Sequence, residues 1–340
     1  MRCLDIVRPV QYTRLGRTGL QVSRLCMGTM NFGMQCDEDT SFAILDAAFE
    51  AGIDFIDTAD VYPPTGLRTW GLTEEIVGRW LAARPGRRDD LVIATKFGHP
   101  MGDRPWQQGG SRRHVLEAID GSLRRLGIDA VDLYQIHTYD PAVTHDETLG
   151  ALDGLVRAGK VRYIGCSNYL AYRLARAIGR AEVLRLVRYE CVQPRYNLLY
   201  RNAERELLPL CEEEGVGVIP FNPLAGGFLS GKHRVDSPPP EGRFTIGTAG
   251  PLHRERYWHE REFATVESLR PLAAEAGMSM TQLAVAWTLA NPAITAPIIG
   301  ASRPDQLQDP IAAVGTPIDA DLKRTLDEQT AEYVNHPAVR

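Results

Sequence analysis

The sequence predicts an α/β fold in which eight parallel strands alternate with helices and close into a single (β/α)8 TIM barrel. Short apolar runs recur roughly every 30–40 residues, and the stretches between them have helical periodicity. The length of 340 residues is enough for one such barrel. We therefore expect residues 1–340 to form one domain, with its core at about residues 12–330.

An open, doubly wound sheet is the alternative architecture. A sheet of that kind normally carries the pattern GxGxxG after its first strand when it binds a dinucleotide. No such pattern follows Gly28 or occurs elsewhere in the chain. The number of strands and the length together favour the closed barrel.

Eight runs rich in apolar or β-branched residues are the expected strands. In chain order they are Arg24–Met30, Ile53–Thr58, Leu91–Lys96, Val131–His137, Val161–Cys166, Val187–Gln193, Val216–Phe221 and Ile294–Ile299. Parallel neighbours must be joined by crossover connections, so helices are expected between them.

Five of the intervening stretches have clear helical periodicity. They are Asp39–Ala51, Thr73–Ala82, Arg112–Leu126, Asp146–Ala158 and Asn202–Glu214. Thr73, which two glutamates follow, is expected to cap the start of its helix with its hydroxyl group. Glycines stand just past four helix ends, where the left-handed backbone suits them: Gly52, Gly127, Gly159 and Gly215.

Two segments do not fit the alternation of strands and helices. Residues 12–22 precede the first strand and predict a small hairpin that closes the bottom of the barrel. Residues 232–260 are rich in proline, glycine and arginine and predict a long loop, which in a barrel is usually functional or mobile.

Composition and charge exclude several classes of protein. Hydrophobic residues make up 44% and charged residues 24% of the chain, as in a globular rather than a disordered protein. The net charge of −5 and the lack of a long basic block argue against nucleic acid as a partner. No apolar run approaches the ~18 residues of a membrane span, so no membrane partner is expected.

The N-terminus and the cysteines favour the cytoplasm. The first residues lack the apolar core of a secretory signal. The six cysteines are scattered and form no CxxC pair, so neither a zinc site nor a disulfide framework is indicated. A reducing compartment is the simplest location for such a chain, and no metal centre is expected.

Polar side chains stand at the C-terminal ends of three consecutive predicted strands. Asp57 lies near the end of the second strand, Lys96 ends the third and His137 ends the fourth. Tyr62 lies in the loop that follows Asp57. Because the C-terminal strand ends of a barrel converge on its catalytic face, we expect these four side chains to meet.

The chemistry of this set suits the reduction of a carbonyl group. A tyrosine ionises near pH 10, and an ammonium beside Tyr62 is expected to lower the pKa of its phenol. Asp57 would hold Lys96 charged and oriented, and His137 would bond to the same substrate oxygen. The set contains neither a nucleophile paired with a base nor three metal ligands. It suits a reduction in which another group supplies the hydride.

Each residue also has a simpler interpretation. Asp57 could cap a helix, Lys96 could be a solvated charge, and His137 could be a core histidine. Tyr62 could be an ordinary loop aromatic. A metal site built on Asp57 and His137 is a further alternative, which the neighbouring lysine opposes because it repels a cation. The position of all four at the tips of consecutive strands favours acid–base chemistry.

Further motifs extend this pattern from about residue 15 to about residue 330. They are Gly28-Thr29-Met30, the run from Asp57 to Tyr62, Ala-Thr-Lys96, Gln-Ile-His137, Gly-Cys-Ser167-Asn168, the run from Phe221 to Lys232, and the run from Ser302 to Gln306. In this order the motifs resemble those of the aldo-keto reductases. The resemblance implies a barrel that binds NADP(H) without a Rossmann motif, with Tyr62 as the general acid supported by Lys96, Asp57 and His137.

The resemblance also implies which residues contact the cofactor, NADPH or NADP+. Ser167, Asn168 and Gln193 offer amide and hydroxyl groups for the carboxamide, and Phe221 offers an aromatic face to the nicotinamide ring. The glycine-rich loop that ends at Lys232 suits a pyrophosphate, although its glycines alone also suit a plain flexible turn. The expected contacts are Gly28, Thr29, Met30, Asp57, Ser167, Asn168, Gln193, Phe221, Asn222, Pro223, Leu224, Ala225, Gly226, Gly231, Lys232, Ser302, Arg303 and Gln306.

The adenosine end of the cofactor has its own expected contacts. Ser302 and Arg303 stand where a helix begins after the last strand, and by resemblance they hold the 2′-phosphate. The guanidinium predicts a preference for NADPH over NADH, although Asp305 is close enough to compete. Gln306 is expected near the adenine. A contact from Asp309 stays open, because the proline after it lacks the side-chain amide that the family often has there.

The sequence is therefore interpreted as that of a cytoplasmic, NADPH-dependent enzyme. Its substrate is a small aldehyde or ketone, such as a keto sugar or another sugar-derived carbonyl compound. The arginine-rich segment 243–261 suits an anionic substrate or is simply a solvated loop. The alternative is a cofactor-binding, redox-sensing subunit of a larger complex with little turnover, as in some relatives of this family. The substrate and the oligomeric state stay open.

Overall fold

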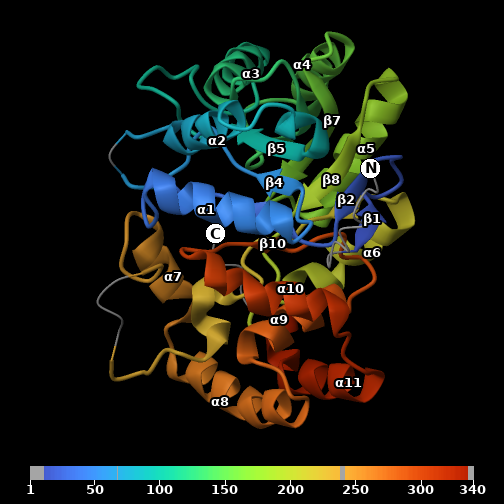
Figure 1. Cartoon of the computed structure of the whole chain (residues 1–340). Helices are drawn as coiled ribbons and strands as arrows, with labels where there is room; N and C mark the ends of the chain where they lie inside the picture. Colours follow the sequence, from blue (N-terminus) through green and yellow to red (C-terminus); the bar gives the residue numbers. More distant parts are fainter. Residues whose placement is uncertain (1–10, 67, 238–241, 336–340) are drawn as a thin grey trace, which may run out of the picture.

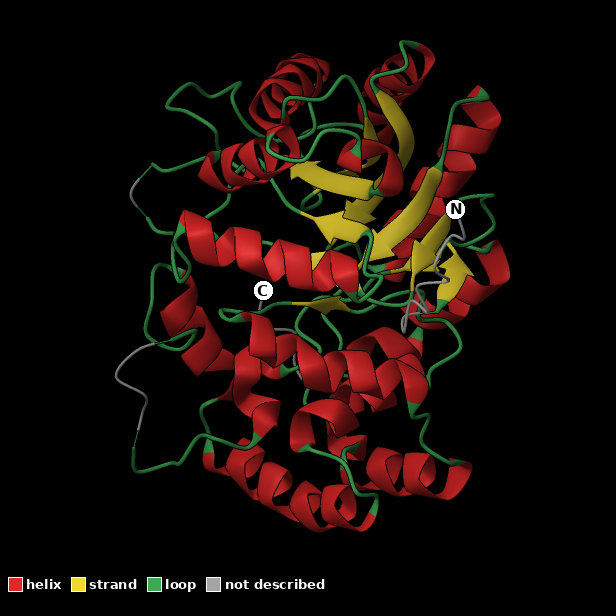
Figure 2. Cartoon of the chain, in the orientation of Figure 1, coloured by secondary structure: helices red, strands yellow, loops and turns green. Residues whose placement is uncertain are grey.

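A curled parallel sheet surrounded by helices forms the protein (Figure 1, Figure 2). The computed structural model describes residues 11–66, 68–237 and 242–335. In this part of the chain the sheet has eight strands in the order β10-β3-β4-β5-β6-β7-β8-β9. The strands are β3 (Cys26–Gly28), β4 (Phe55–Asp57), β5 (Val92–Phe97), β6 (Val131–Ile136), β7 (Val161–Ser167), β8 (Tyr189–Gln193), β9 (Gly217–Val218) and β10 (Ile298–Ile299).

Backbone contacts also join the two strands at the ends of that order. The backbone N–H of Ile298 donates to the carbonyl of Pro220 at 2.8 Å, and Val218 forms a parallel bridge with Ile294. The parallel strands therefore follow one another in chain order around a closed circle. This arrangement confirms the barrel and excludes the doubly wound sheet, whose strand order reverses part-way.

Helices and 3-10 turns connect the strands and lie outside them (Figure 2). The helices are α1 (Glu38–Glu50), α2 (Leu72–Ala82), α3 (Arg112–Leu126), α4 (His145–Arg157), α5 (Ala171–Leu184), α6 (Leu207–Glu214), α7 (Ala249–Tyr257), α8 (Glu260–Glu275), α9 (Met280–Leu289), α10 (Gln308–Gly315) and α11 (Ala320–Gln329). The 3-10 turns are η1 (Arg87–Asp90), η2 (Asn202–Arg205), η3 (Ala225–Ser230), η4 (Pro304–Leu307) and η5 (Ala331–Asn335). None of these described helices is long and apolar enough to cross a membrane.

All five predicted helices are present with nearly the predicted bounds, except that the stretch Asn202–Glu214 is divided between η2 and α6. The four glycines predicted at helix ends all have positive φ: Gly52, Gly127, Gly159 and Gly215. The predicted cap at Thr73 is wrong. Gly71 occupies the N-cap position of α2, and the hydroxyl of Thr73 instead donates to the carbonyl of Phe32 at 3.0 Å.

The prediction of one long loop over residues 232–260 is wrong in part, because α7 occupies Ala249–Tyr257. Glycine and proline in the first turn of this helix concealed it, yet proline is tolerated there because no backbone N–H is needed. His253 and Tyr257 are buried one turn apart on the same face of α7. Packing of that face therefore outweighs the low helix propensity of the sequence.

Two hydrophobic clusters give the barrel its core. Alternate strand residues point inward and outward, so Cys26 and Phe55 belong to the cluster inside the barrel, while Met27 and Ile56 face the helices. The inner cluster also contains Leu15, which is fully buried. The helix-facing cluster holds most of the buried aromatic side chains.

The predicted N-terminal hairpin is present as β1 (Tyr12–Arg14) and β2 (Gln21–Ser23). Leu15 in its turn reaches the inner cluster, and the backbone N–H of Arg17 donates to the carbonyl of Gly215 at 2.7 Å. Gly215 lies just before β9, so the hairpin closes the N-terminal end of the barrel. The opposite end is left for the site.

The cysteines of the described residues are free and buried: Cys26, Cys36, Cys166, Cys191 and Cys211. Burial raises the pKa of each thiol, to about 11 for Cys36 and about 12 for Cys211.

Candidate active site

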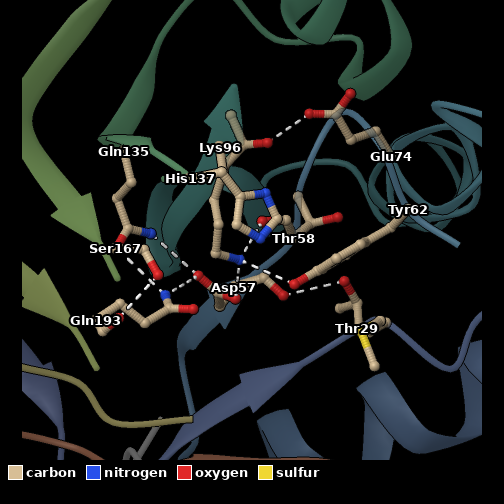
Figure 3. Close-up of polar contacts among 12 residues, drawn as sticks. Thr29, Asp57, Thr58, Tyr62, Glu74, Lys96, Gln135, His137, Ser167 and Gln193 are labelled. Atoms are coloured by element: carbon tan, nitrogen blue, oxygen red, sulfur yellow. Dashed lines mark hydrogen bonds and ion pairs between the residues drawn. The ribbon is translucent and has the colours of Figure 1, made fainter. Parts of the chain in front are cut away.

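A buried lysine–aspartate pair lies at the C-terminal ends of β4 and β5 (Figure 3). Lys96 is 0% exposed, and its Nζ donates to Asp57 Oδ2 at 2.5 Å and to the carbonyl of Thr58 at 2.8 Å. Burial by itself lowers the pKa of an ammonium, but the nearby Asp57 carboxylate leaves the pKa of Lys96 above its ordinary value. Lys96 is therefore charged at neutral pH.

Two glutamines hold the other oxygen of Asp57 (Figure 3). The side-chain amide of Gln193 on β8 donates to Asp57 Oδ1 at 2.9 Å, and that of Gln135 on β6 donates at 3.1 Å. Sequence reasoning named Gln193 only as a cofactor contact and not as a partner of Asp57, and it did not single out Gln135. The feature that could have identified Gln135 is its uncharged polar side chain, which stands in a mostly apolar strand at a position that faces the interior.

Tyr62 reaches the same point from the loop after β4. Lys96 Nζ lies 3.5 Å from Tyr62 Oη and 4.9 Å from the centre of its ring. Burial raises the pKa of Tyr62, and the opposing effect of the ammonium is smaller, so this pKa lies above its ordinary value. The expectation that Lys96 lowers this pKa overall is wrong, because desolvation of the phenolate is the larger effect. Tyr62 keeps its proton at neutral pH.

His137, just past β6, completes the predicted set. Its ring meets that of Tyr62 edge-on, with centroids 5.8 Å apart, and His99 packs against its other side at 4.5 Å. Burial, followed by the charges of Lys96 and His99, lowers the pKa of His137 well below its ordinary value. Its Nδ1 is buried without a hydrogen-bond partner among the described residues. The imidazole is therefore neutral at neutral pH.

The start of α2 fixes the loop of Tyr62 relative to the strand of Lys96. The backbone N–H of Thr73 donates to the carbonyl of Tyr62 at 3.3 Å. The next residue, Glu74, is fully buried and accepts a bond of 2.5 Å from the hydroxyl of Thr95, which precedes Lys96 (Figure 3). The other oxygen of Glu74 pairs with Arg125 of α3 at 2.7 Å. One helix start thus positions both groups.

A cleft of about 1730 Å³ opens above the acid–base set. The predicted residues that line it are Gly28, Thr29, Met30, Asp57, Tyr62, His137, Ser167, Asn168, Gln193, Phe221, Asn222, Pro223, Leu224, Gly226, Lys232, Ser302, Arg303 and Gln306. Two predicted contacts do not line it: Ala225 is fully buried, and the carbonyl of Gly231 accepts a bond from Arg270. The described residues contain no group of three or more His, Cys, Asp or Glu side chains placed to hold a metal ion.

Comparison with known proteins identifies the family. Residues 24–330 match the model of the Aldo/keto reductase family. The chain belongs to this family. It is 41% identical over 323 residues to a Bacillus subtilis protein named uncharacterized oxidoreductase YrpG, which covers 94% of this chain and 95% of that protein.

Two further relatives have more specific names. A probable voltage-gated potassium channel subunit beta of rice is 36% identical over 307 residues, covering 90% of this chain and 91% of that protein. The L-glyceraldehyde 3-phosphate reductase of Escherichia coli is 34% identical over 319 residues, covering 90% of this chain and 88% of that protein.

The cleft of this aldo/keto reductase has the chemistry that a nicotinamide dinucleotide requires. Asn168, with φ at 57°, uses its amide N–H to donate to the carbonyl of His137 at 3.0 Å, which leaves its side-chain oxygen free to accept. Lys232 is exposed at the cleft with no carboxylate partner among the described residues. An amide acceptor and an unpaired ammonium suit a carboxamide and a pyrophosphate. The residues present therefore fit the cofactor.

The residues after β10, where the sequence predicts the adenosine contacts, form one part of the cleft lining. Gln306 Oε1 accepts bonds from the backbone N–H and the hydroxyl of Ser302, at 2.8 and 3.2 Å. Arg303 is exposed and pairs with Asp305 at 3.1 Å, so the competition expected from Asp305 is present. Asp309 lines the cleft and accepts a bond from Ser279 at 2.7 Å.

Arg243 is a cleft residue that sequence reasoning did not single out. Its guanidinium donates to Asn31 Oδ1 and lies 3.8 Å from the sulfur of Met30. Burial lowers the pKa of Arg243 to about 10, so it is charged at neutral pH, and its charge reaches Tyr62. An arginine in a segment rich in arginine and proline carries no distinguishing signal in the sequence.

Proposed function

We propose that this aldo/keto reductase uses NADPH to reduce an aldehyde or a ketone to the alcohol, with Tyr62 as the proton donor. Carbonyl reduction is the reaction of the family. The observation that carries the proposal is the fully buried Lys96, held between Asp57 and Tyr62 at the base of the cleft. A buried ammonium beside a phenol is an arrangement for stabilising the phenolate that remains after proton transfer.

Each side chain of the set has a distinct task. Tyr62 Oη holds a proton at neutral pH because burial raises its pKa, and it passes that proton to the carbonyl oxygen of the substrate. Lys96 stabilises the resulting phenolate, and Asp57 keeps Lys96 charged and in place. His137 is neutral and can donate a single ring N–H to the same oxygen.

Bound NADPH would supply the hydride. Ser167, Asn168 and Gln193 would hold its nicotinamide end, since their polar groups line the cleft beside the acid–base set. Arg303 at the far end would favour a 2′-phosphate, because its guanidinium is the cation that best matches phosphate oxygens.

The test is the consumption of NADPH by the purified protein with a panel of aldehydes, ketones and keto sugars. Tyr62→Phe should lose at least ~10²-fold in kcat/KM, the usual effect of removing a positioned acid. Tyr172→Phe, at a tyrosine that is 60% exposed on α5, is the matched control and should keep its activity. Reduction by Tyr62→Phe at the wild-type rate would show that another group donates the proton.

A second function is favoured by one finding, the 36% identity to proteins of rice and Arabidopsis named probable voltage-gated potassium channel subunit beta. On this alternative the protein is a cofactor-binding, redox-sensing subunit of a larger complex. Tight binding of NADPH without measurable turnover on any carbonyl compound would favour it over the enzyme.

A further inference from the structure

We propose that Arg195, His253 and Arg256 form an anion site at the cleft that binds a phosphate group carried by the carbonyl substrate. That the phosphate belongs to a reducible substrate rests on the proposed function. The existence of the anion site rests on the structure alone.

Arg195 is a buried cation without a carboxylate partner among the described residues. It follows β8, is 8% exposed, and places its guanidinium 3.4 Å from the centre of the Tyr200 ring. Two other buried arginines are paired: Arg188 with Glu214 at 2.9 Å, and Arg201 with Glu204 at 2.8 Å. A buried charge without a counter-charge is costly, so Arg195 is a position that an anion would stabilise.

Arg256 of α7 brings a second guanidinium to the same place. Burial lowers the pKa of Arg256, and the positive charge of Arg195 lowers it further. Its Nε is buried without a hydrogen-bond partner in the part of the chain that the structure describes. The charge of Glu255, which is exposed on the same helix, acts on the pKa of Arg256, but among the described residues no ion pair joins the two side chains. The guanidinium groups of Arg195 and Arg256 therefore repel each other.

His253, one turn before Arg256, supplies a neutral donor. It is 4% exposed, and neither ring nitrogen has a partner among the described residues. Burial lowers its pKa to about 3, and the charges of Arg243, Arg256 and Arg195 act in the same direction. A buried imidazole that makes no hydrogen bond destabilises the folded protein. A ligand that accepts a hydrogen bond from its ring N–H would offset this cost.

Two members of the anion site open into the cleft of the acid–base set, and the third, Arg195, does not line the cleft but acts through its charge on both of them. His253 and Arg256 line the cleft that Tyr62 and His137 also line. Arg243 lines this cleft as well, and its charge acts on the pKa of both Tyr62 and His253. One substrate can therefore place its carbonyl group at Tyr62 and its charged group at the anion site.

The composition of the site selects a phosphate monoester. Guanidinium groups bind phosphate oxygens through paired N–H donors, and near neutral pH the ligand carries close to two negative charges. Two cations and a neutral donor match that charge better than they match a single carboxylate. The phosphates of the cofactor have other candidate partners in the same cleft, namely Lys232 and Arg303.

The experiment compares a phosphorylated with an unphosphorylated substrate, glyceraldehyde 3-phosphate and glyceraldehyde. The wild type should have the higher kcat/KM for the phosphorylated compound. Arg256→Gln should reduce the ratio of the two values at least tenfold, as expected when one charge-assisted contact is lost. Arg254→Gln, at an exposed arginine of the same helix, is the matched control and should keep the wild-type ratio.

A second measurement does not require turnover. Titration of the purified protein with inorganic phosphate by calorimetry should show binding by the wild type and by Arg254→Gln, and weaker binding by Arg256→Gln. Circular dichroism establishes that each variant is folded. Succinic semialdehyde, compared with butanal, tests whether a carboxylate is accepted instead, in which case the assignment to phosphate is wrong.

The outcomes separate this inference from the proposed function. If no carbonyl compound is reduced but phosphate binding depends on Arg256, the anion site stands and the proposed function fails. If both glyceraldehydes are reduced with the same ratio in wild type and Arg256→Gln, the function stands and the inference is overturned. Weaker binding of NADPH by Arg256→Gln at an unchanged ratio would assign the cluster to the cofactor and overturn it as well.

Discussion

Tyr62 is the residue at which burial and charge oppose each other most directly. Burial keeps the proton on the phenol, whereas Lys96 at 3.5 Å favours its release. A general acid needs both influences: it must be protonated before the reaction and must leave a stabilised anion afterwards. The pH dependence of reduction should therefore report on Lys96.

Removing Lys96 gives the first prediction at this scale. In Lys96→Met the opposing charge is lost, and the pKa of Tyr62 rises further. Activity should fall at least ~10²-fold. Because Tyr62 donates only when protonated, the decline of kcat/KM at alkaline pH should also move to higher pH. Because the ordinary pKa of tyrosine is about 10 and that of Tyr62 is higher, rates measured from about pH 8 to about pH 12 check this. Lys160→Met, at an exposed ion pair with Asp120, is the control.

The ion pair of Arg303 and Asp305 gives the second prediction at the residue scale. Arg303→Ala should weaken NADPH about tenfold, the low end for a charge-assisted bond, because the side chain is 63% exposed. Asp305→Asn should strengthen NADPH severalfold, since the guanidinium is no longer shared; an exposed pair is worth up to about 1 kcal/mol. Fluorescence titrations with NADPH and NADH measure both effects. Equal weakening of the two cofactors would place Arg303 away from the 2′-phosphate.

The sequence predicted the residues of this site better than their electrostatics. Asp57, Lys96 and His137 could be placed together because strand ends of a barrel converge. The direction of the Tyr62 pKa could not be predicted, since it depends on how much water the fold excludes. Gln135 and Arg243 were missed because their roles arise from contacts between segments far apart in the chain.

At the scale of elements, α2 is the connection that matters most for the site. Its first turn contacts the Tyr62 loop through Thr73 and the Lys96 strand through Glu74. Sequence reasoning assigned Thr73 to a cap, because a hydroxyl before two glutamates is a common helix start. In the fold, the hydroxyl of Thr73 and the carboxylate of Glu74 make tertiary contacts instead. Tertiary packing likewise makes a helix, α7, of a segment that was predicted to be a loop.

Glu74→Gln tests this connection. The change leaves the guanidinium of Arg125 without its carboxylate; breaking a fully buried pair costs about 3–5 kcal/mol, and the cost should be lower here because Arg125 is 20% exposed. Chemical denaturation should show reduced stability, and kcat should fall as the geometry of Tyr62 and Lys96 loosens. Glu75→Gln, at the exposed neighbour, should change neither quantity appreciably. Equal stability of the two variants would contradict the role of Glu74.

At the scale of the whole molecule, the hairpin β1–β2 closes one end of the barrel and the cleft opens at the other. The closure depends on a close backbone approach. Gly16 has φ at 56°, and a Cβ there would lie 2.4 Å from the carbonyl oxygen of Gly215. The strand order itself could be predicted from the alternation of elements, but this contact could not, since it joins residues about two hundred positions apart.

Gly16→Ala should therefore destabilise the protein. The left-handed backbone alone costs a non-glycine residue about 1–2 kcal/mol, and the collision with the backbone before β9 adds to it. Urea denaturation of Gly16→Ala and Gly19→Ala is the measurement, because an added Cβ at Gly19 meets nothing within 4 Å. A loss of stability in Gly19→Ala as large as in Gly16→Ala would show that the hairpin turn, not its contact with the barrel, is sensitive.

The burial of the cysteines has a consequence for the kind of compound that the protein can process. Thiolates add reversibly to the carbonyl carbon of aldehydes and are alkylated by unsaturated ketones. The five described thiols are buried and have raised pKa values, so at neutral pH they hold little thiolate to be attacked. At these five positions, reactive carbonyl compounds therefore find no ready site of attack.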